Sequence, residues 1–196
     1  MRFSAVLLAG GKSRRMGCDK ALLHLPGDPR PLWQRQLDDV LRPLQPAEIF
    51  FSGRARPGLP ADVILLADEI TDCGPLAGIA AALRVMTTPW LVVLAVDLPA
   101  MTADFFRTRL LARCARNQGA VPQTTDGFFE PLAAVYPKNC LAEAEARLRV
   151  GADRSLQNFV RAAQSAGLII SERIAEVELG LFTNWNTLAD TRAPLR

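Results

Sequence analysis

The chain has 196 residues with a formal net charge of +3, and 49% of its side chains are hydrophobic. That length suffices for one compact domain with a substantial core, while so small a charge argues against nucleic-acid binding and the lack of an apolar run of about 18 residues argues against a membrane span. The N-terminus shows no signal-peptide pattern, and 4 scattered cysteines with 1 histidine argue against a zinc site and favour reduced thiols in the cytoplasm.

The first predicted strand, residues 3–8, runs directly into a glycine-rich, cationic loop. The loop passes from Gly10-Gly11 to Gly17 with three cationic side chains between them, and Lys20 follows. Glycines let backbone N–H groups approach an anion closely and the cations neutralise it, so the loop is predicted to bind a polyphosphate. It fits neither common pattern, because Walker A needs glycine where Val6 stands and the dinucleotide pattern needs glycine at position 12 or 13.

Beyond the loop, apolar periodicity and turn residues divide the first half of the chain into alternating helices and strands. The expected elements are a helix over 31–44, strands at 49–51 and 63–66, a helix over 75–86, a strand at 90–96 and a helix capped by Thr102. Between the strands at 49–51 and 63–66, Arg54, Arg56 and Pro57-Gly58 are predicted to form an exposed turn. The alternation up to residue 117 predicts a Rossmann-like α/β fold, a mostly parallel sheet with helices on both faces.

The second half alternates less regularly. Its expected elements are strands at 119–122 and 132–136, helices at 139–149 and 155–166, a strand at 168–171 and a final short helix capped by Asn186. Repeats, low-complexity segments and linkers are absent from the sequence, so we expect a single domain over 1–196.

Lysine is used sparingly, which singles out the loop. The lysines are Lys12, Lys20 and Lys138 alone, and residues 1–56 hold ten Lys/Arg against five Asp/Glu. Because arginine supplies nearly all other positive charge, two lysines in one loop indicate a phosphate site rather than ordinary solvent-exposed charges.

Several polar residues directly follow predicted strands. In open α/β sheets ligands bind beyond the carboxyl ends of the strands, so Gly10-Gly11, Ser52, Asp68 and Asp97 are expected at one edge. Asp97, after a buried strand, is a candidate Mg²⁺ ligand. The alternative is a helix cap, but Thr102 is better placed for that.

Residues 8–20 read L-A-G-G-K-S-R-R-M-G-C-D-K and resemble the nucleotidyltransferase signature L-A-G-G-x-S-x-R-M-G-x-D-K. Within that superfamily the stretch is most similar to molybdenum cofactor guanylyltransferases of the MobA type. Sugar-nucleotide pyrophosphorylases usually carry a G-x-G-T-R-L loop, and the molybdenum cofactor cytidylyltransferases tend to have Leu-Ala-Ala-Gly at this point. The resemblance implies one nucleotidyltransferase domain, with a nucleotide-binding part at about 1–117 and a pterin-binding part at about 118–196.

The resemblance also implies a nucleotide site. Asp97 lies in Ala95-Val96-Asp97-Leu98-Pro99, which is similar to the family's P-C-D-x-P, and would hold Mg²⁺; Lys20 would stabilise charge at the α-phosphate, and Arg14 or Arg15 would hold the outer phosphates. Asp68 either contacts the nucleotide or ends a strand, and at Ser52 the family often has asparagine. The implied catalytic residues are Lys20, Arg15 and Asp97, and the implied nucleotide-binding residues are Leu8, Ala9, Gly10, Gly11, Arg14, Lys20, Asp68, Pro75 of the G-P-L-A-G segment, and Asp97.

Three later segments resemble the family's pterin site. Residues 130–133 read E-P-L-A and lead into the strand that would cover the second substrate. Arg154, in a segment similar to G-x-R-S-L, would bind a pterin phosphate or simply begin a helix. Asn184 and Asn186 match the family's F-x-N-x-N-T, although Asn186 is equally a helix cap.

The function implied is transfer of GMP from Mg-GTP to molybdenum-molybdopterin, which gives the guanine dinucleotide cofactor and pyrophosphate. Mg²⁺ is the expected cofactor, GTP and molybdopterin are the substrates, and transient contact with molybdenum cofactor synthesis proteins and acceptor apoenzymes is expected; nucleic acid and membrane are not. The alternatives are a cytidylyltransferase or sugar nucleotidylyltransferase of the same fold, or a nucleotide-binding module without turnover.

Overall fold

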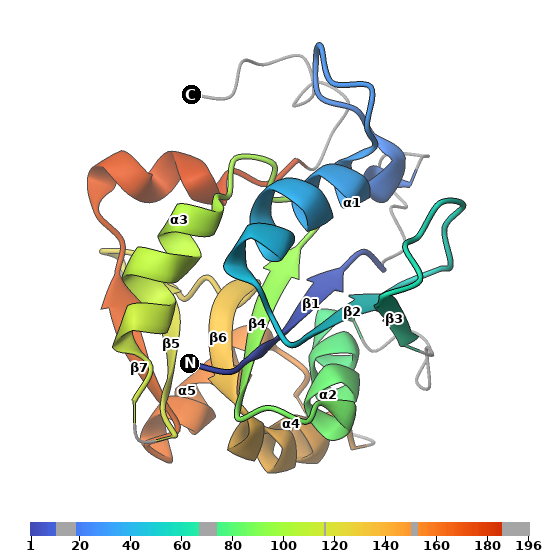
Figure 1. Ribbon diagram of the computed structural model, residues 1–196. Coiled ribbons are helices and arrows are strands. Elements are labelled where there is room, and N and C mark those ends of the chain that lie inside the picture. Colours follow the sequence, from blue (N-terminus) through green and yellow to red (C-terminus); the bar gives the residue numbers. More distant parts are fainter. Residues whose placement is uncertain (11–18, 67–73, 116, 150–152, 186–196) are drawn as a thin grey trace.

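The computed structural model describes residues 1–10, 19–66, 74–115, 117–149 and 153–185. Its centre is a seven-stranded sheet of order β3-β2-β1-β4-β6-β5-β7 (Figure 1). Only β6 runs antiparallel to its neighbours within this sheet, so the predicted, mostly parallel arrangement is confirmed. The strands are β1 (Ser4–Leu8), β2 (Glu48–Ser52), β3 (Val63–Leu66), β4 (Trp90–Ala95), β5 (Gly119–Gln123), β6 (Ala133–Pro137) and β7 (Ile169–Arg173).

Helices cover both faces of the sheet. The α-helices are α1 (Leu32–Arg35), α2 (Pro75–Val85), α3 (Ala103–Phe105), α4 (Leu141–Leu148) and α5 (Leu156–Ser165). Both α1 and α3 continue into π and 3₁₀ turns, as far as Leu44 and Arg113 respectively. Thr102 caps α3, as predicted, since its Oγ1 accepts a hydrogen bond from Phe105 N at 3.3 Å. None of the described helices is long and apolar enough to cross a bilayer.

The core consists of two layers because side chains alternate along each strand. On β1, Ala5 and Leu7 join the layer with Trp33 of α1 and Phe105 of α3, whereas Val6 and Leu8 join the layer under α2, α4 and α5. Figure 1 shows α1 and α3 on one side of the sheet and α2, α4 and α5 on the other. β4 is buried on both faces, as its unbroken apolar sequence indicates.

Candidate functional site

The end of β1 lies between the ends of two other parallel strands. Leu8 pairs with Ser52 of β2 on one side and Ala95 of β4 on the other. The contacts continue beyond the strand, because Ala9 N donates to Ser52 O at 2.8 Å and Val96 N donates to Leu8 O at 3.0 Å. Leu8 and Ala9 are buried. The segment that matches the nucleotidyltransferase signature, residues 8–20 (the signature loop), therefore begins at the carboxyl edge of the sheet, at an interior strand.

Two glycines allow the backbone segments to pack closely at this edge. A Cβ on Gly53, whose φ is +152°, would lie 2.9 Å from Ala9 C. A Cβ on Gly78, in the first turns of α2, would clash with Ser52 Oγ and lie 2.8 Å from Leu8 Cδ2. Gly78 thus brings the start of α2, at Pro75, close to the ends of β1 and β2, and Ser52 is buried beneath it.

Lys20 and Asp97, the two residues singled out for catalysis that the structure describes, form an ion pair. Lys20 Nζ lies 3.1 Å from Asp97 Oδ2, and the side chains are 19% and 22% exposed. Lys20 begins a 3₁₀ turn, Lys20–Leu22, that Asp19 caps by accepting from Ala21 N at 3.0 Å. Asp97 follows β4 after one intervening residue, Val96. An ammonium and a carboxylate, both reachable from solvent, thus lie at the carboxyl edge, where Val96 bonds to Leu8 at the end of β1.

The turn that carries Asp97 is held by groups that sequence reasoning missed. Gln36 Nε2 donates to Leu98 O at 2.5 Å and Arg35 Nη1 donates to Pro99 O at 2.6 Å, both from the helix that starts with α1. Trp185 N donates to Asp97 O at 3.0 Å. Gln36 is fully buried on the apolar face between Trp33 and Val40; a glutamine at such a position was the one available sequence signal.

The candidate pterin segments reach the same edge. Ala95 N donates to Leu132 O at 2.8 Å, so the residues before β6 run beside the end of β4. Glu130 there is half-buried, and burial raises the pKa of its carboxyl group. Asn184 is exposed and directly precedes the buried Trp185 that bonds to Asp97. These contacts bring the C-terminal segments to the Lys20–Asp97 pair.

The start of α5 also lies at this edge. Gln157 exchanges two hydrogen bonds with the backbone of Phe129, at 2.8 and 3.1 Å, next to Glu130. Arg154 is exposed just before α5. The remaining predicted residues, Gly11, Arg14, Arg15, Asp68 and Asn186, lie outside the described residues, and their assignments stay predictions.

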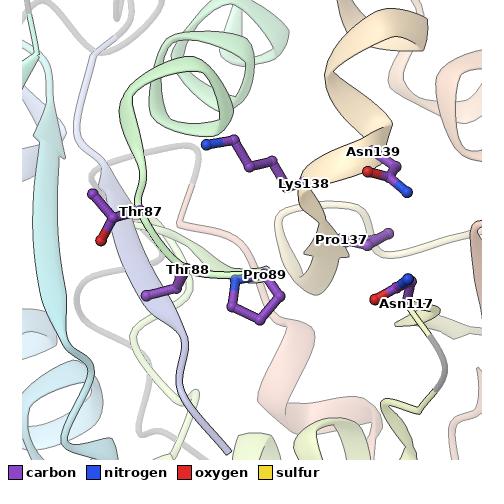
Figure 2. Close-up of a pocket in the computed structure, with 7 residues that line it drawn as sticks. All are labelled: Thr87, Thr88, Pro89, Asn117, Pro137, Lys138 and Asn139. Carbon is purple, nitrogen blue, oxygen red and sulfur yellow. The ribbon is translucent and has the colours of Figure 1, made fainter.

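A hollow lies at the opposite, amino edge of the sheet (Figure 2). Its volume is about 340 Å³, and Lys138 in its wall already donates to Met86 O at 2.6 Å. Figure 2 shows Thr87, Thr88 and Pro89 on one side and Asn117, Pro137 and Asn139 on the other. Thr87 to Pro89 precede β4 whereas Asp97 follows it, so this hollow is separate from the Lys20–Asp97 edge.

Comparison with known proteins gives consistent matches over nearly the whole chain. Residues 5–166 match the MobA-like NTP transferase domain. A "Probable molybdenum cofactor guanylyltransferase" of Opitutus terrae is 42% identical over 191 residues, 95% of this chain and 92% of that protein. The solved structure of molybdopterin-guanine dinucleotide biosynthesis protein A from Archaeoglobus fulgidus has a TM-score of 0.70 at 23% identity, covering 96% of this chain and 95% of that one. The 2-C-methyl-D-erythritol 4-phosphate cytidylyltransferase of Thermus thermophilus has a TM-score of 0.66 at 17% identity, covering 95% and 94%; both structures share the fold.

Proposed function

The chain belongs to the MobA-like NTP transferase family, and from that premise we propose that it is a molybdenum cofactor guanylyltransferase. It joins GMP from GTP to the terminal phosphate of molybdenum-molybdopterin. An oxygen of the pterin phosphate attacks the α-phosphorus, a new P–O bond forms there, and the bond to the oxygen that leaves with pyrophosphate breaks. No covalent enzyme intermediate is needed, so the protein's contribution is positioning and charge neutralisation.

The observation that carries this proposal is the Lys20–Asp97 pair at the carboxyl edge. Lys20 is proposed to stabilise the negative charge that builds on the α-phosphate as the bond to pyrophosphate breaks. A module that only bound nucleotide would not need this ammonium placed beside a carboxylate. The pair therefore favours turnover over the non-catalytic alternative.

Asp97 is proposed as the ligand of Mg²⁺, which neutralises phosphate charge when bound. Mg²⁺ in nucleotide sites commonly takes one or two carboxylates and completes its shell with water and substrate phosphates. The residues present fit that pattern, because Asp97 offers a partly exposed carboxylate at the edge of the sheet. One carboxylate with substrate oxygens is enough.

The other contacts are proposed from the resemblance of the sequence segments to the family's motifs. Leu8, Ala9 and Gly10 are proposed to offer backbone groups to the nucleotide, together with Gly11, Arg14, Arg15, Asp68 and Pro75. The pterin is proposed to bind Arg154, Asn184 and Asn186, which keeps the nucleotide-binding part at about 1–117 and the pterin-binding part at about 118–196. The cytoplasm is the proposed compartment, with transient contact to molybdenum cofactor synthesis proteins and acceptor apoenzymes.

Pyrophosphate release tests the proposal. Purified protein is given each of the four NTPs with Mg²⁺, with and without molybdopterin. We expect release from GTP only when molybdopterin is present. Release from CTP instead would assign the chain to a cytidylyltransferase, and release from no nucleotide would support the non-catalytic alternative.

A further inference from the structure

The side chain of Arg56 is buried where the sequence predicts an exposed turn. It lies between β2 and β3, in a loop whose neighbouring Arg54, Ala55 and Pro57 are exposed, yet only 8% of its side chain is accessible. A long cationic side chain is rarely buried without a partner, because removing its charge from water is costly. The position of this guanidinium therefore requires a specific interaction.

That interaction is with Asp19 of the signature loop. Arg56 Nη2 lies 2.6 Å from Asp19 Oδ2. The Nε of Arg56 is buried and has no hydrogen-bond partner among the described residues. Among the described residues, Asp19 thus provides the negative charge that pairs with Arg56. The ion pair connects the β2–β3 loop to the signature loop.

Asp19 uses its other oxygen to fix the turn that carries Lys20. Asp19 Oδ1 accepts from Ala21 N at 3.0 Å, and Asp19 O accepts from Leu22 N at 3.0 Å. The turn begins at Lys20, whose Nζ lies 3.1 Å from Asp97 Oδ2. A continuous set of contacts therefore runs from Arg56 through Asp19 to the ammonium of Lys20.

We propose that Arg56 is a positioning residue that orients Asp19 and, through it, the Lys20 turn toward the reacting phosphate. The role rests on the proposed nucleotidyl transfer, since it assigns Arg56 to the catalytic step and not to binding of GTP. Arg56 does not touch substrate in this role. Its removal leaves Asp19 free to turn toward water, and Lys20 loses its fixed place at Asp97.

The kinetic test compares Arg56→Ala with Arg54→Ala. Arg54 lies two residues away, is exposed and carries the same charge, so it is a matched control. We expect Arg56→Ala to lower kcat roughly 10- to 100-fold, the scale of a misplaced catalytic group, with KM for GTP within about twofold. Arg54→Ala should match the parent protein, and Arg56→Lys should recover part of the loss. A rise in KM with unchanged kcat would overturn the proposal by making Arg56 a ligand of the nucleotide.

A double-mutant cycle tests the route through Asp19. If Arg56 acts only through that carboxylate, Arg56→Ala with Asp19→Ala should be no slower than the slower single variant. If the double variant instead loses kcat by the product of the two single-variant factors, Arg56 and Asp19 act independently, and the proposal is overturned. Thermal unfolding of each variant accompanies the assay, and Arg56→Lys replaces Arg56→Ala in the cycle if the alanine variant is unfolded.

A measurement without substrate separates this proposal from the proposed function. The chain has lysines only at 12, 20 and 138, so ¹³C-dimethylation gives few side-chain signals, and loss of one in Lys20→Arg identifies Lys20. We expect Arg56→Ala and Asp19→Ala to shift the Lys20 signal in the same way, while Arg54→Ala does not and Lys138 stays unchanged. An unmoved Lys20 signal in Arg56→Ala overturns the positioning role even if the protein turns over GTP; a moved signal supports it even if no nucleotide is a substrate.

Discussion

Lys20 and Asp97 form one ion pair, but replacing them is expected to change different kinetic properties of the protein. Their atoms lie 3.1 Å apart and both side chains are partly exposed, so each is accessible to a bound nucleotide. The ammonium is proposed to meet charge that appears during the reaction, whereas the carboxylate is proposed to hold an ion that is present before it. The two roles affect different kinetic quantities.

Lys20→Ala is expected to lower kcat by roughly 10²–10³, the cost of losing one donor to transition-state charge. KM for GTP should change far less, because an interaction that is stronger in the transition state than in the ground state is expressed in kcat. Steady-state pyrophosphate release checks this. A large rise in KM with unchanged kcat would place Lys20 in ground-state binding.

Asp97→Asn is expected to raise the Mg²⁺ concentration needed for half-maximal rate, because an amide is a poorer ligand than a carboxylate for a hard cation. Excess Mg²⁺ should then recover part of the activity of Asp97→Asn and none of that of Lys20→Ala, which serves as the control. A Mg²⁺ titration of both variants decides between the roles. An unchanged Mg²⁺ dependence in Asp97→Asn would rule out Asp97 as the ligand and make Asp68 the next carboxylate to test.

Cys114 and Cys140 are buried, and burial raises the pKa of each thiol to about 12. The thiolate is the reactive form, so both should resist iodoacetamide in the folded protein at pH 8 and react only on unfolding. Above the ordinary thiol pKa of 9.0 the folded state keeps protons that the unfolded state loses, so stability should fall as pH rises from 9.0 toward 12. Peptide mapping after timed alkylation, with urea as the positive control, checks the first point; rapid labelling of either peptide at pH 8 would contradict it.

At the scale of the element, α2 depends on a glycine that helix propensity alone disfavours. Replacing an exposed helical glycine by alanine usually gains about 1 kcal/mol. At Gly78, however, the new Cβ would clash with Ser52 Oγ and lie 2.8 Å from Leu8 Cδ2, in a buried contact. The contact should outweigh the propensity, because overpacking a dense core costs about 1–3 kcal/mol.

Gly78→Ala is therefore expected to lower the free energy of unfolding by up to about 2 kcal/mol. Adding Ser52→Ala removes the hydroxyl that the new Cβ meets and should recover part of the loss. Urea unfolding of the parent, the two single variants and the double variant measures the effect. A more stable Gly78→Ala would mean that α2 can move away from β1 and β2 at little cost.

The sequence predicts elements well where one local pattern is decisive. The apolar run before Asp97 identifies β4 because a strand covered on both faces needs apolar side chains throughout, and β3 is found at 63–66 as predicted. The order of strands is not contained in such patterns. After β5 the chain turns back, and β6 lies between β4 and β5, antiparallel to both; that position is decided by packing between distant segments.

The candidate site divides in the same way. The rule that ligands bind beyond the carboxyl ends of strands predicts that Gly10, Ser52 and Asp97 lie at one edge. The strand ends that carry them do lie side by side, and the structure adds Lys20 as the partner of Asp97. Gln36 and Arg56 were not predicted as parts of the site. Gln36 bonds to Leu98 O and Arg56 pairs with Asp19 Oδ2, both far away in the sequence. Contacts between residues so far apart produce no local sequence pattern from which they could be predicted.

At the scale of the whole molecule, the fold does not choose the nucleotide, because a cytidylyltransferase with a TM-score of 0.66 shares it. We expect the choice to depend on the signature loop after β1 and on the start of α2, which Gly78 brings close to the ends of β1 and β2. A site that hydrogen-bonds one base edge leaves its polar groups unpaired with another base, so discrimination is strong.

We expect kcat/KM for GTP to exceed that for CTP by at least roughly 100-fold. Competition between GTP and CTP at equal concentration, with the dinucleotide products separated by chromatography, measures the ratio. Arg54→Ala should leave the ratio unchanged because that side chain is exposed, whereas equal products from the parent protein would mean that neither segment reads the base.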